Sequence, residues 1–248
     1  ELIGMPKKHL DTHLAKVRAL GEFLLSAGLS VADLGVTYSS LLGHYNSTIS
    51  DINIIVYGKE KFWSLMRFLE TASHPSLRWK TKEEWIDFRN ERNRSLIFPE
   101  DVFLTAMTRK KSEGFFDDSL FIIFCAENPS ETWNTWGSEH VTLIGNTAIR
   151  ARVKDDHSSI VRPGLYEIED VSVAQDGKTY LVKQVVFYSR DYCMIARTGE
   201  EIEVSGQLEE VETGTGDKFS RIVVGYFDSY LDERREQEYI RPLIGSGK

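Results

Sequence analysis

The stretch Gly35–Gly58 decides the fold; it reads GVTYSSLLGHYNSTISDINIIVYG. Its first part predicts a short strand that ends in a turn of small residues, Thr37–Ser40, where a short helix begins. Its last part, Ser50–Tyr57, predicts a second strand. Because side chains two apart on a strand share a face, we expect Asp51 and Asn53 to point the same way, with isoleucines entering the core between them.

The turn at Thr37–Ser40 offers backbone N–H groups and serine hydroxyls at a helix N-terminus, an arrangement that suits a phosphate. Polar residues on the neighbouring strand would face that phosphate. Phosphoryl transfer needs this arrangement, because its chemistry is mainly positioning and neutralisation of charge by metal ions. The alternative without a functional role is an ordinary βαβ-like turn followed by a strand that begins with polar residues.

In the order of these residues, the segment resembles the nucleotidyltransferase superfamily typified by DNA polymerase β. The signature of that superfamily is Gly-Ser followed, after about ten residues, by Asp-x-Asp. The segment is similar to an archaeal group of nucleotidyltransferase-domain proteins. The resemblance implies that Ser39 and Ser40 bind nucleotide phosphates, that Asp51 and Asn53 occupy the catalytic positions, and that Asp51 binds the metal ion.

The segment departs from the signature at two positions. Tyr38 stands where the superfamily has glycine, and Asn53 stands where it has the second aspartate. The superfamily also has a third acid on another strand, but Leu120–Cys125 holds no carboxylate; Asp117, Asp118 and Glu127 flank it. Hard divalent cations need several carboxylate oxygens, so we expect weakened or absent catalysis.

Two functions therefore stay open. The first is a nucleotidyltransferase fold that has lost catalysis and acts as a binding module for a nucleotide, a nucleic acid or a protein. The alternative is an active enzyme that uses Mg²⁺ and a nucleoside triphosphate and transfers the nucleotide to an unknown acceptor. Asn53 as an engineered inactivating substitution is a further interpretation.

The fold class predicted is α+β, with three regions along the chain. Residues 1–135 form a nucleotidyltransferase-like mixed sheet with helices, because strand and helix patterns alternate. Residues 136–230 hold five strand-like segments separated by turn signals, which predicts a smaller, mostly-β, barrel-like domain. Residues 231–248 are charged and then glycine-rich, and we expect a flexible tail there. In the first region we predict helices over 7–28, 62–69, 83–92 and 102–111, and one long strand over 115–125.

The net charge of −8 argues against broad nucleic-acid binding but leaves room for a local basic site. Arg109, Lys110 and Lys111 are the candidate nucleic-acid contacts, although cations there also complement a helix dipole. The stretch 78–94 interleaves cations with aromatics, but its acids favour a solvated helix with ion pairs. An OB-like barrel in the C-terminal half would need basic and aromatic faces, whereas acids crowd 200–212.

The remaining candidates have plain structural interpretations. His9 and His13 are spaced to chelate a metal, but exposed positions on a helix are the stronger interpretation. Two distant cysteines exclude a disulfide framework and suit a reducing cytoplasm. No apolar run approaches the roughly 20 residues that cross a membrane, and the first residues lack the pattern of a signal peptide, so we expect a cytoplasmic protein.

Overall fold

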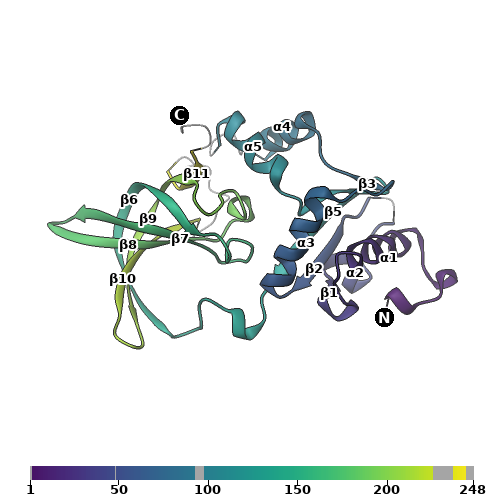
Figure 1. The fold of residues 1–248 in the computed structure, drawn as a ribbon, viewed down its shortest axis with the longest axis horizontal. Coiled ribbons are helices and arrows are strands. Elements are labelled where there is room, and N and C mark those ends of the chain that lie inside the picture. Colours follow the sequence, from purple (N-terminus) through teal and green to yellow (C-terminus); the bar gives the residue numbers. More distant parts are fainter. Residues whose placement is uncertain (1, 48, 93–97, 226–236, 244–248) are drawn as a thin grey trace. The chain divides into compact units, whose positions relative to one another are not determined.

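The computed structural model describes residues 2–47, 49–92, 98–225 and 237–243. The fold is α+β, as predicted, and it holds two sheets. The chain divides into two compact units, residues 1–81 with 108–131 and residues 82–107 with 132–248. Figure 1 shows the elements of each unit.

The first unit is built on a five-stranded mixed sheet, sheet A, with the strand order β1-β2-β5-β4-β3. Strand β2 is antiparallel to β1 and parallel to β5. The strands of this sheet are β1 (Leu34–Val36), β2 (Ile52–Tyr57), β3 (Leu77–Arg78), β4 (Glu113–Phe116) and β5 (Ser119–Ala126). Its helices are α1 (Thr12–Leu25), α2 (Tyr38–Leu42) and α3 (Lys59–Thr71), with short 3-10 helices η1 (Leu2–Gly4), η2 (Lys7–His9), η3 (Val31–Asp33) and η5 (Pro129–Glu131).

Alternation along β2 gives sheet A two different faces. Ile52, Ile54 and Val56 are almost wholly buried on one face. Ile54 and Val17 of α1 line the same pocket on that face. Asn53 and Ile55 are half-buried on the opposite face. This alternation is the one that the sequence predicts for the strand.

The segment predicted as one long strand over 115–125 is a hairpin of β4 and β5. Asp117 and Asp118, at its tip, have φ values of 46° and 61°. Two successive left-handed residues make the type I′ turn that matches the twist of a two-residue hairpin. The prediction was wrong because Asp-Asp is a weaker signal for that turn than Asn-Gly or Asp-Gly.

The second unit contains sheet B, with the order β10-β8-β7-β6-β9-β11 and an additional pairing of β10 with β9. These pairings close five of the strands, β6-β7-β8-β10-β9, into a ring, and only β8 and β10 run parallel. The strands are β6 (Glu139–Asp155), β7 (Gly164–Gln175), β8 (Lys178–Phe187), β9 (Glu201–Thr213), β10 (Lys218–Val224) and β11 (Tyr239–Pro242).

The first predicted boundary needs a correction. Helix α4 (Lys82–Glu91) and most of α5 (Glu100–Arg109) belong to the second unit, although their sequence lies inside the first. Their buried side chains, Trp85, Phe103 and Met107, share one hydrophobic cluster with the strands of sheet B. A boundary placed by strand and helix patterns alone cannot detect such an excursion of the chain.

The predicted tail also needs a correction. Within it, β11 pairs with β9, and Ile240 is fully buried. The remainder of 231–248 lies outside the described residues, apart from the short pieces next to β11. No helix in the described part of the chain is long and apolar enough to cross a membrane.

The middle of the loop between β8 and β9, residues 192–196, is buried, and one buried hydroxyl bonds to it at two points. Tyr166 of β7 is fully buried, and its hydroxyl donates to the Tyr192 carbonyl at 2.7 Å. The same oxygen accepts from the Ile195 amide at 3.0 Å. Helix η6 (Arg190–Tyr192) starts this loop. Burial raises the pKa of Tyr166 far above its ordinary value, so the hydroxyl stays protonated.

Candidate functional site

The turn Thr37–Ser40, which is predicted to bind a phosphate, contains a residue in the left-handed backbone conformation that favours glycine. Tyr38 begins α2 with φ at 52°, in the left-handed region that a glycine adopts at no cost. A residue with a side chain pays about 1–3 kcal/mol for this conformation. The ring of Tyr38 is 54% exposed and meets the Phe124 ring edge-on at 5.8 Å. Tyr38 therefore adopts a backbone conformation that favours glycine, at the position where the predicted signature would have one.

The two serines of the turn have different environments. Ser39 is half-buried, and its carbonyl accepts the Gly43 and His44 amides, which closes α2. Ser40 is buried, and its Oγ lies 2.8 Å from the Nε2 atom of His13 on α1. The hydroxyl of Ser40 is thus tied to the protein interior, whereas the backbone at Tyr38 and Ser39 forms the open part of the turn.

His13 itself differs from the prediction. It is 1% exposed, so the expectation of an exposed position was wrong, and His9 lies outside α1 in η2. The His13 ring stacks on the Tyr45 ring, with 4.5 Å between the two centroids. The Tyr45 hydroxyl donates to Asp11, the N-cap of α1. Burial lowers the pKa of His13, which keeps the imidazole neutral near pH 7.

Asp51 and Asn53, the two residues predicted to occupy catalytic positions, lie next to this turn. Asp51 is half-buried immediately before β2, and Asn53 is half-buried within it. The Asn53 carbonyl accepts the Thr37 amide at 3.1 Å. The strand pairing thus brings the turn and Asn53 together, as the segment Gly35–Gly58 predicts.

Three residues in register across sheet A, Asn53, Ile122 and Glu113, show which side chains neighbour Asn53 where a third acid would be expected. Asn53 pairs with Ile122 on β5, and Ile122 pairs with Glu113 on β4. Paired residues point to the same face, so all three share the face of Asn53. The strand next to Asn53 therefore presents an isoleucine. Glu113 is two strands away from Asn53, a span of about 10 Å, which is too far for a shared metal pair.

Glu113 also has another partner. Lys80, which follows β3, forms an ion pair with it, and the two side chains are only 7% and 9% exposed. Glu113 was not among the predicted acids, because residues 115–125 were predicted as one long strand that begins after it. The charge of Lys80 offsets that of Glu113, so this carboxylate is not offered to a cation.

The residues present do not fit a divalent metal ion with its usual ligands. Among the described residues, no group of three or more His, Cys, Asp or Glu side chains could hold a metal. Asp51 would contribute one carboxylate, and Asn53 only a neutral amide oxygen. Mg²⁺ needs carboxylates or phosphates to replace its water ligands. The arrangement gives no physical basis for a metal-assisted transfer step.

The candidate nucleic-acid contacts lie where α5 leads into β4. The ammonium group of Lys111 lies 4.8 Å from the Trp79 ring centroid and donates to the Thr108 carbonyl. Burial lowers the pKa of Lys111. Arg109 and Lys110 are half-buried. Their role in binding nucleic acid stays a prediction.

The predicted helical stretch 78–94 is in fact divided. Arg78 belongs to β3 and stacks on Phe115 at 4.0 Å, while α4 begins only at Lys82. The first unit has 12 Lys+Arg against 12 Asp+Glu, and the second has 18 against 26. The net charge of −8 therefore belongs wholly to the second unit.

Two exposed arginines of sheet B are paired with acids on the neighbouring strand. On β6, Arg150 pairs with Glu203 and Arg152 pairs with Glu201, each at 3.2 Å. Paired charges of this kind present little net positive field to a phosphate backbone. Whether this region binds nucleic acid stays a prediction.

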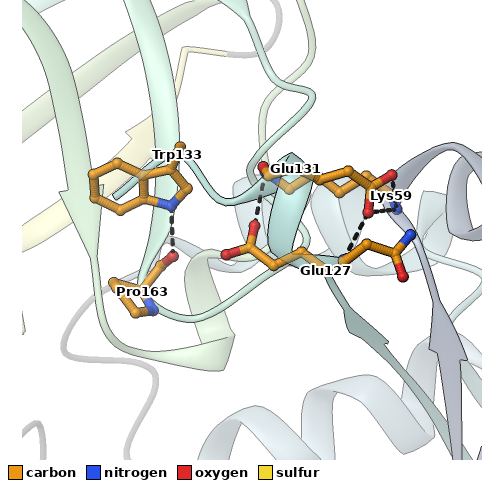
Figure 2. Close-up of polar contacts among 6 residues, drawn as sticks. Lys59, Glu127, Glu131, Trp133 and Pro163 are labelled. Atoms are coloured by element: carbon orange, nitrogen blue, oxygen red, sulfur yellow. Dashed lines mark hydrogen bonds and ion pairs between the residues drawn. The ribbon is translucent and has the colours of Figure 1, made fainter. Parts of the chain in front are cut away.

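The positive end of α3 is occupied by an acid of the same unit. The Glu131 carboxylate accepts the Lys59 amide at 3.1 and 3.2 Å and the Asn128 amide at 2.8 Å. Lys59 is 2% exposed, and its ammonium group pairs with Glu127 at 2.8 Å and donates to the Glu131 carbonyl (Figure 2). This helix end is therefore a structural clasp.

Just after the clasp, the chain enters the second unit. The Trp133 indole donates to the Pro163 carbonyl at 3.1 Å (Figure 2). Its ring packs with Leu165, Val186 and Val223. Trp133 therefore anchors the start of the second unit to its own sheet.

Comparison with known proteins adds a relative without an assigned activity. The chain matches no protein-family model. It is similar to an uncharacterized protein of Methanocaldococcus jannaschii, with 28% identity over 227 residues that cover 89% of this chain. The chain spans 64% of that relative's length, which is less than two thirds. Function therefore has to be argued from the site.

Proposed function

We propose that this protein is a non-catalytic member of the nucleotidyltransferase fold that binds a nucleoside triphosphate without transferring its nucleotide. The observation that carries the proposal is the row Asn53, Ile122 and Glu113 across sheet A. An amide, an apolar side chain and a distant, ion-paired carboxylate replace the acids that two metal ions would need.

Binding is supported by the turn between β1 and α2. The turn keeps the left-handed backbone at Tyr38, and Thr37 makes no side-chain capping bond to the amides at the start of α2. Amides left over at a helix start are donors for a phosphate oxygen. The exposed Tyr38 ring limits how closely a phosphate approaches, so the binding is weaker than at a glycine.

Label transfer and binding are measured together. The wild-type protein, Asn53→Asp and Asp51→Ala are incubated with labelled triphosphates, Mg²⁺ or Mn²⁺, and protein, RNA or DNA acceptors. We expect no transfer by any of the three, and triphosphate binding that persists when EDTA replaces the metal. Transfer by the wild type that Asp51→Ala abolishes would establish the alternative, an active Mg²⁺-dependent nucleotidyltransferase.

Two substitutions at Tyr38 test the role of the turn. Tyr38→Gly removes both the ring and the backbone cost, whereas Tyr38→Ala removes the ring alone. We expect triphosphate affinity to rise in both variants, and the free energy of unfolding to rise only in Tyr38→Gly, by about 1 kcal/mol. Unchanged affinity in both variants would exclude this turn as the phosphate site.

A further inference from the structure

The first unit contains a cavity on the side of sheet A opposite Asn53. Its volume is about 430 Å³. Apolar side chains of α1, β1 and β2 form most of its wall, among them Val17, Val36 and Ile54. The 3-10 helix η1 covers it with Ile3, and α2 contributes Leu41. The cavity is therefore separate from the row that faces Asn53.

This space is partly open to solvent and is large enough for a small molecule. Folded interiors are close-packed, with few voids larger than a water molecule. A dry engineered cavity of about 150 Å³ already binds benzene, and small-molecule sites begin at about 300 Å³. An apolar occupant would restore contacts that the side chains around this space otherwise lack.

The polar groups of the wall restrict the chemistry of an occupant. Arg18 lies at the cavity, but its guanidinium donates to the Met5 carbonyl at 2.6 Å and pairs with Glu22 at 2.7 Å. Its charge is therefore satisfied by the protein. A charged ligand would find no counter-ion in the apolar remainder of the wall.

Ser40 supplies one hydrogen-bonding group at this wall. Its Oγ is 2.8 Å from the Nε2 atom of His13. If the neutral imidazole accepts the serine proton, the serine oxygen can still accept from a ligand. If the imidazole donates instead, the serine O–H can still donate. In either tautomer one hydrogen bond is available.

We propose that the cavity bounded by η1, α1, β1 and α2 binds an uncharged, apolar small molecule that carries a single hydrogen-bonding group directed at Ser40. This proposal does not rest on triphosphate binding, although Ser40 also belongs to the turn considered for the phosphate. Its ligand is recognised by shape and burial, with Ser40 fixing the orientation.

A larger side chain at Gly21 would fill the cavity. Gly21 lies in the middle of α1 on the cavity wall, and a β-carbon there would meet only Ile3 Cδ1, at an ordinary 3.5 Å. The probe is 1-aminoanthracene, an uncharged aromatic amine whose fluorescence rises in apolar surroundings. Anionic anilinonaphthalene sulfonate serves as the charged control, and Leu42→Ala, at an exposed α2 residue outside the wall, as the control variant.

We expect the wild type and Leu42→Ala to bind 1-aminoanthracene and not the sulfonate. Gly21→Leu should weaken the probe's affinity by about tenfold or more and raise Tm, because leucine fills the space and favours the helix. Ser40→Ala should weaken aminoanthracene but leave anthracene unchanged. If Gly21→Leu does not fold, Gly21→Ala must show a smaller loss of affinity. Absence of binding by the wild type, equal binding of the sulfonate, or unchanged affinity in the Gly21 variants would overturn the proposal.

Discussion

Sheet A and sheet B differ in how the charged side chains on neighbouring strands are paired. On sheet B, Arg221 of β10 lies between two carboxylates, with Nε 2.9 Å from Glu209 and Nη1 2.7 Å from Glu139. Burial opposes the charged form, but the two carboxylates outweigh it and raise the pKa of Arg221. On sheet A, the row at Asn53 holds an amide, an isoleucine and a carboxylate that Lys80 neutralises.

This comparison distinguishes charged side chains that stabilise a fold from those that bind a catalytic metal ion. A structural site pairs every buried charge, as around Arg221. A metal-dependent active site instead gathers acids whose mutual repulsion is relieved only by the cation. The row at Asn53 lacks that excess of acid, so it resembles the structural case although it lies beside the turn Thr37–Ser40.

The largest effect is expected from removing the cation of sheet B. Arg221→Met leaves Glu209 buried without its partner and should lower the free energy of unfolding by about 3–5 kcal/mol. Urea denaturation measures it. Lys218→Met, on the same strand, breaks only the exposed pair with Glu212 and should leave stability nearly unchanged. Equal losses in the two variants would show that the buried network has no special role.

A smaller loss is expected at the hydroxyl that holds the β8–β9 loop. Tyr166→Phe removes the partner of the Tyr192 carbonyl and the Ile195 amide, and should cost about 2–3 kcal/mol. The matched control is Tyr180→Phe, because Tyr180 is also buried but its hydroxyl has no hydrogen bond among the described residues. If both variants unfold at the same urea concentration, the hydrogen bonds of the Tyr166 hydroxyl make no special contribution to stability.

The smallest effect is expected at Glu131, which caps the start of α3 in the first unit. Glu131→Gln weakens the cap of α3 and should cost about 1 kcal/mol at pH 7. Burial alone would raise the pKa of Glu131, but hydrogen bonds from the Asn128 and Lys59 amides lower it. Its contribution is therefore complete above pH 4.5, the ordinary value, and is lost as the pH falls through the lowered folded pKa.

The pH dependence provides the internal control for Glu131. The stability difference between Glu131→Gln and the wild type should shrink as the pH falls below about 4.5, when the carboxylate becomes protonated. A difference that is constant between pH 3 and pH 7 would contradict a charge-dependent clasp. Thermal unfolding at several pH values measures this.

Much of the fold follows from local pattern. Alternation predicted β2 and the five long strands from β6 to β10, and the 3.6-residue period predicted α3, α4 and α5. The hairpin at Asp117 and the strand β11 were missed. The first depends on an atypical turn, and the second on pairing with β9, which lies far away in sequence.

The candidate site was predictable only in part. The segment Gly35–Gly58 correctly predicted that Asn53 lies beside the turn, because both are local. Sequence could not show that Ile122 would stand next to Asn53, or that Lys80 would neutralise Glu113, because both depend on strand register across sheet A. The burial of His13 against Ser40 likewise depends on how α1 packs on α2.

The central claim is that the acids of a metal site are incomplete around Asp51. Titration with Mn²⁺, followed by electron paramagnetic resonance, tests it directly on the wild type and on Asp51→Ala. We predict that the two proteins give the same titration, with no tightly bound ion in either. A tight Mn²⁺ site in the wild type that disappears in Asp51→Ala would contradict the account.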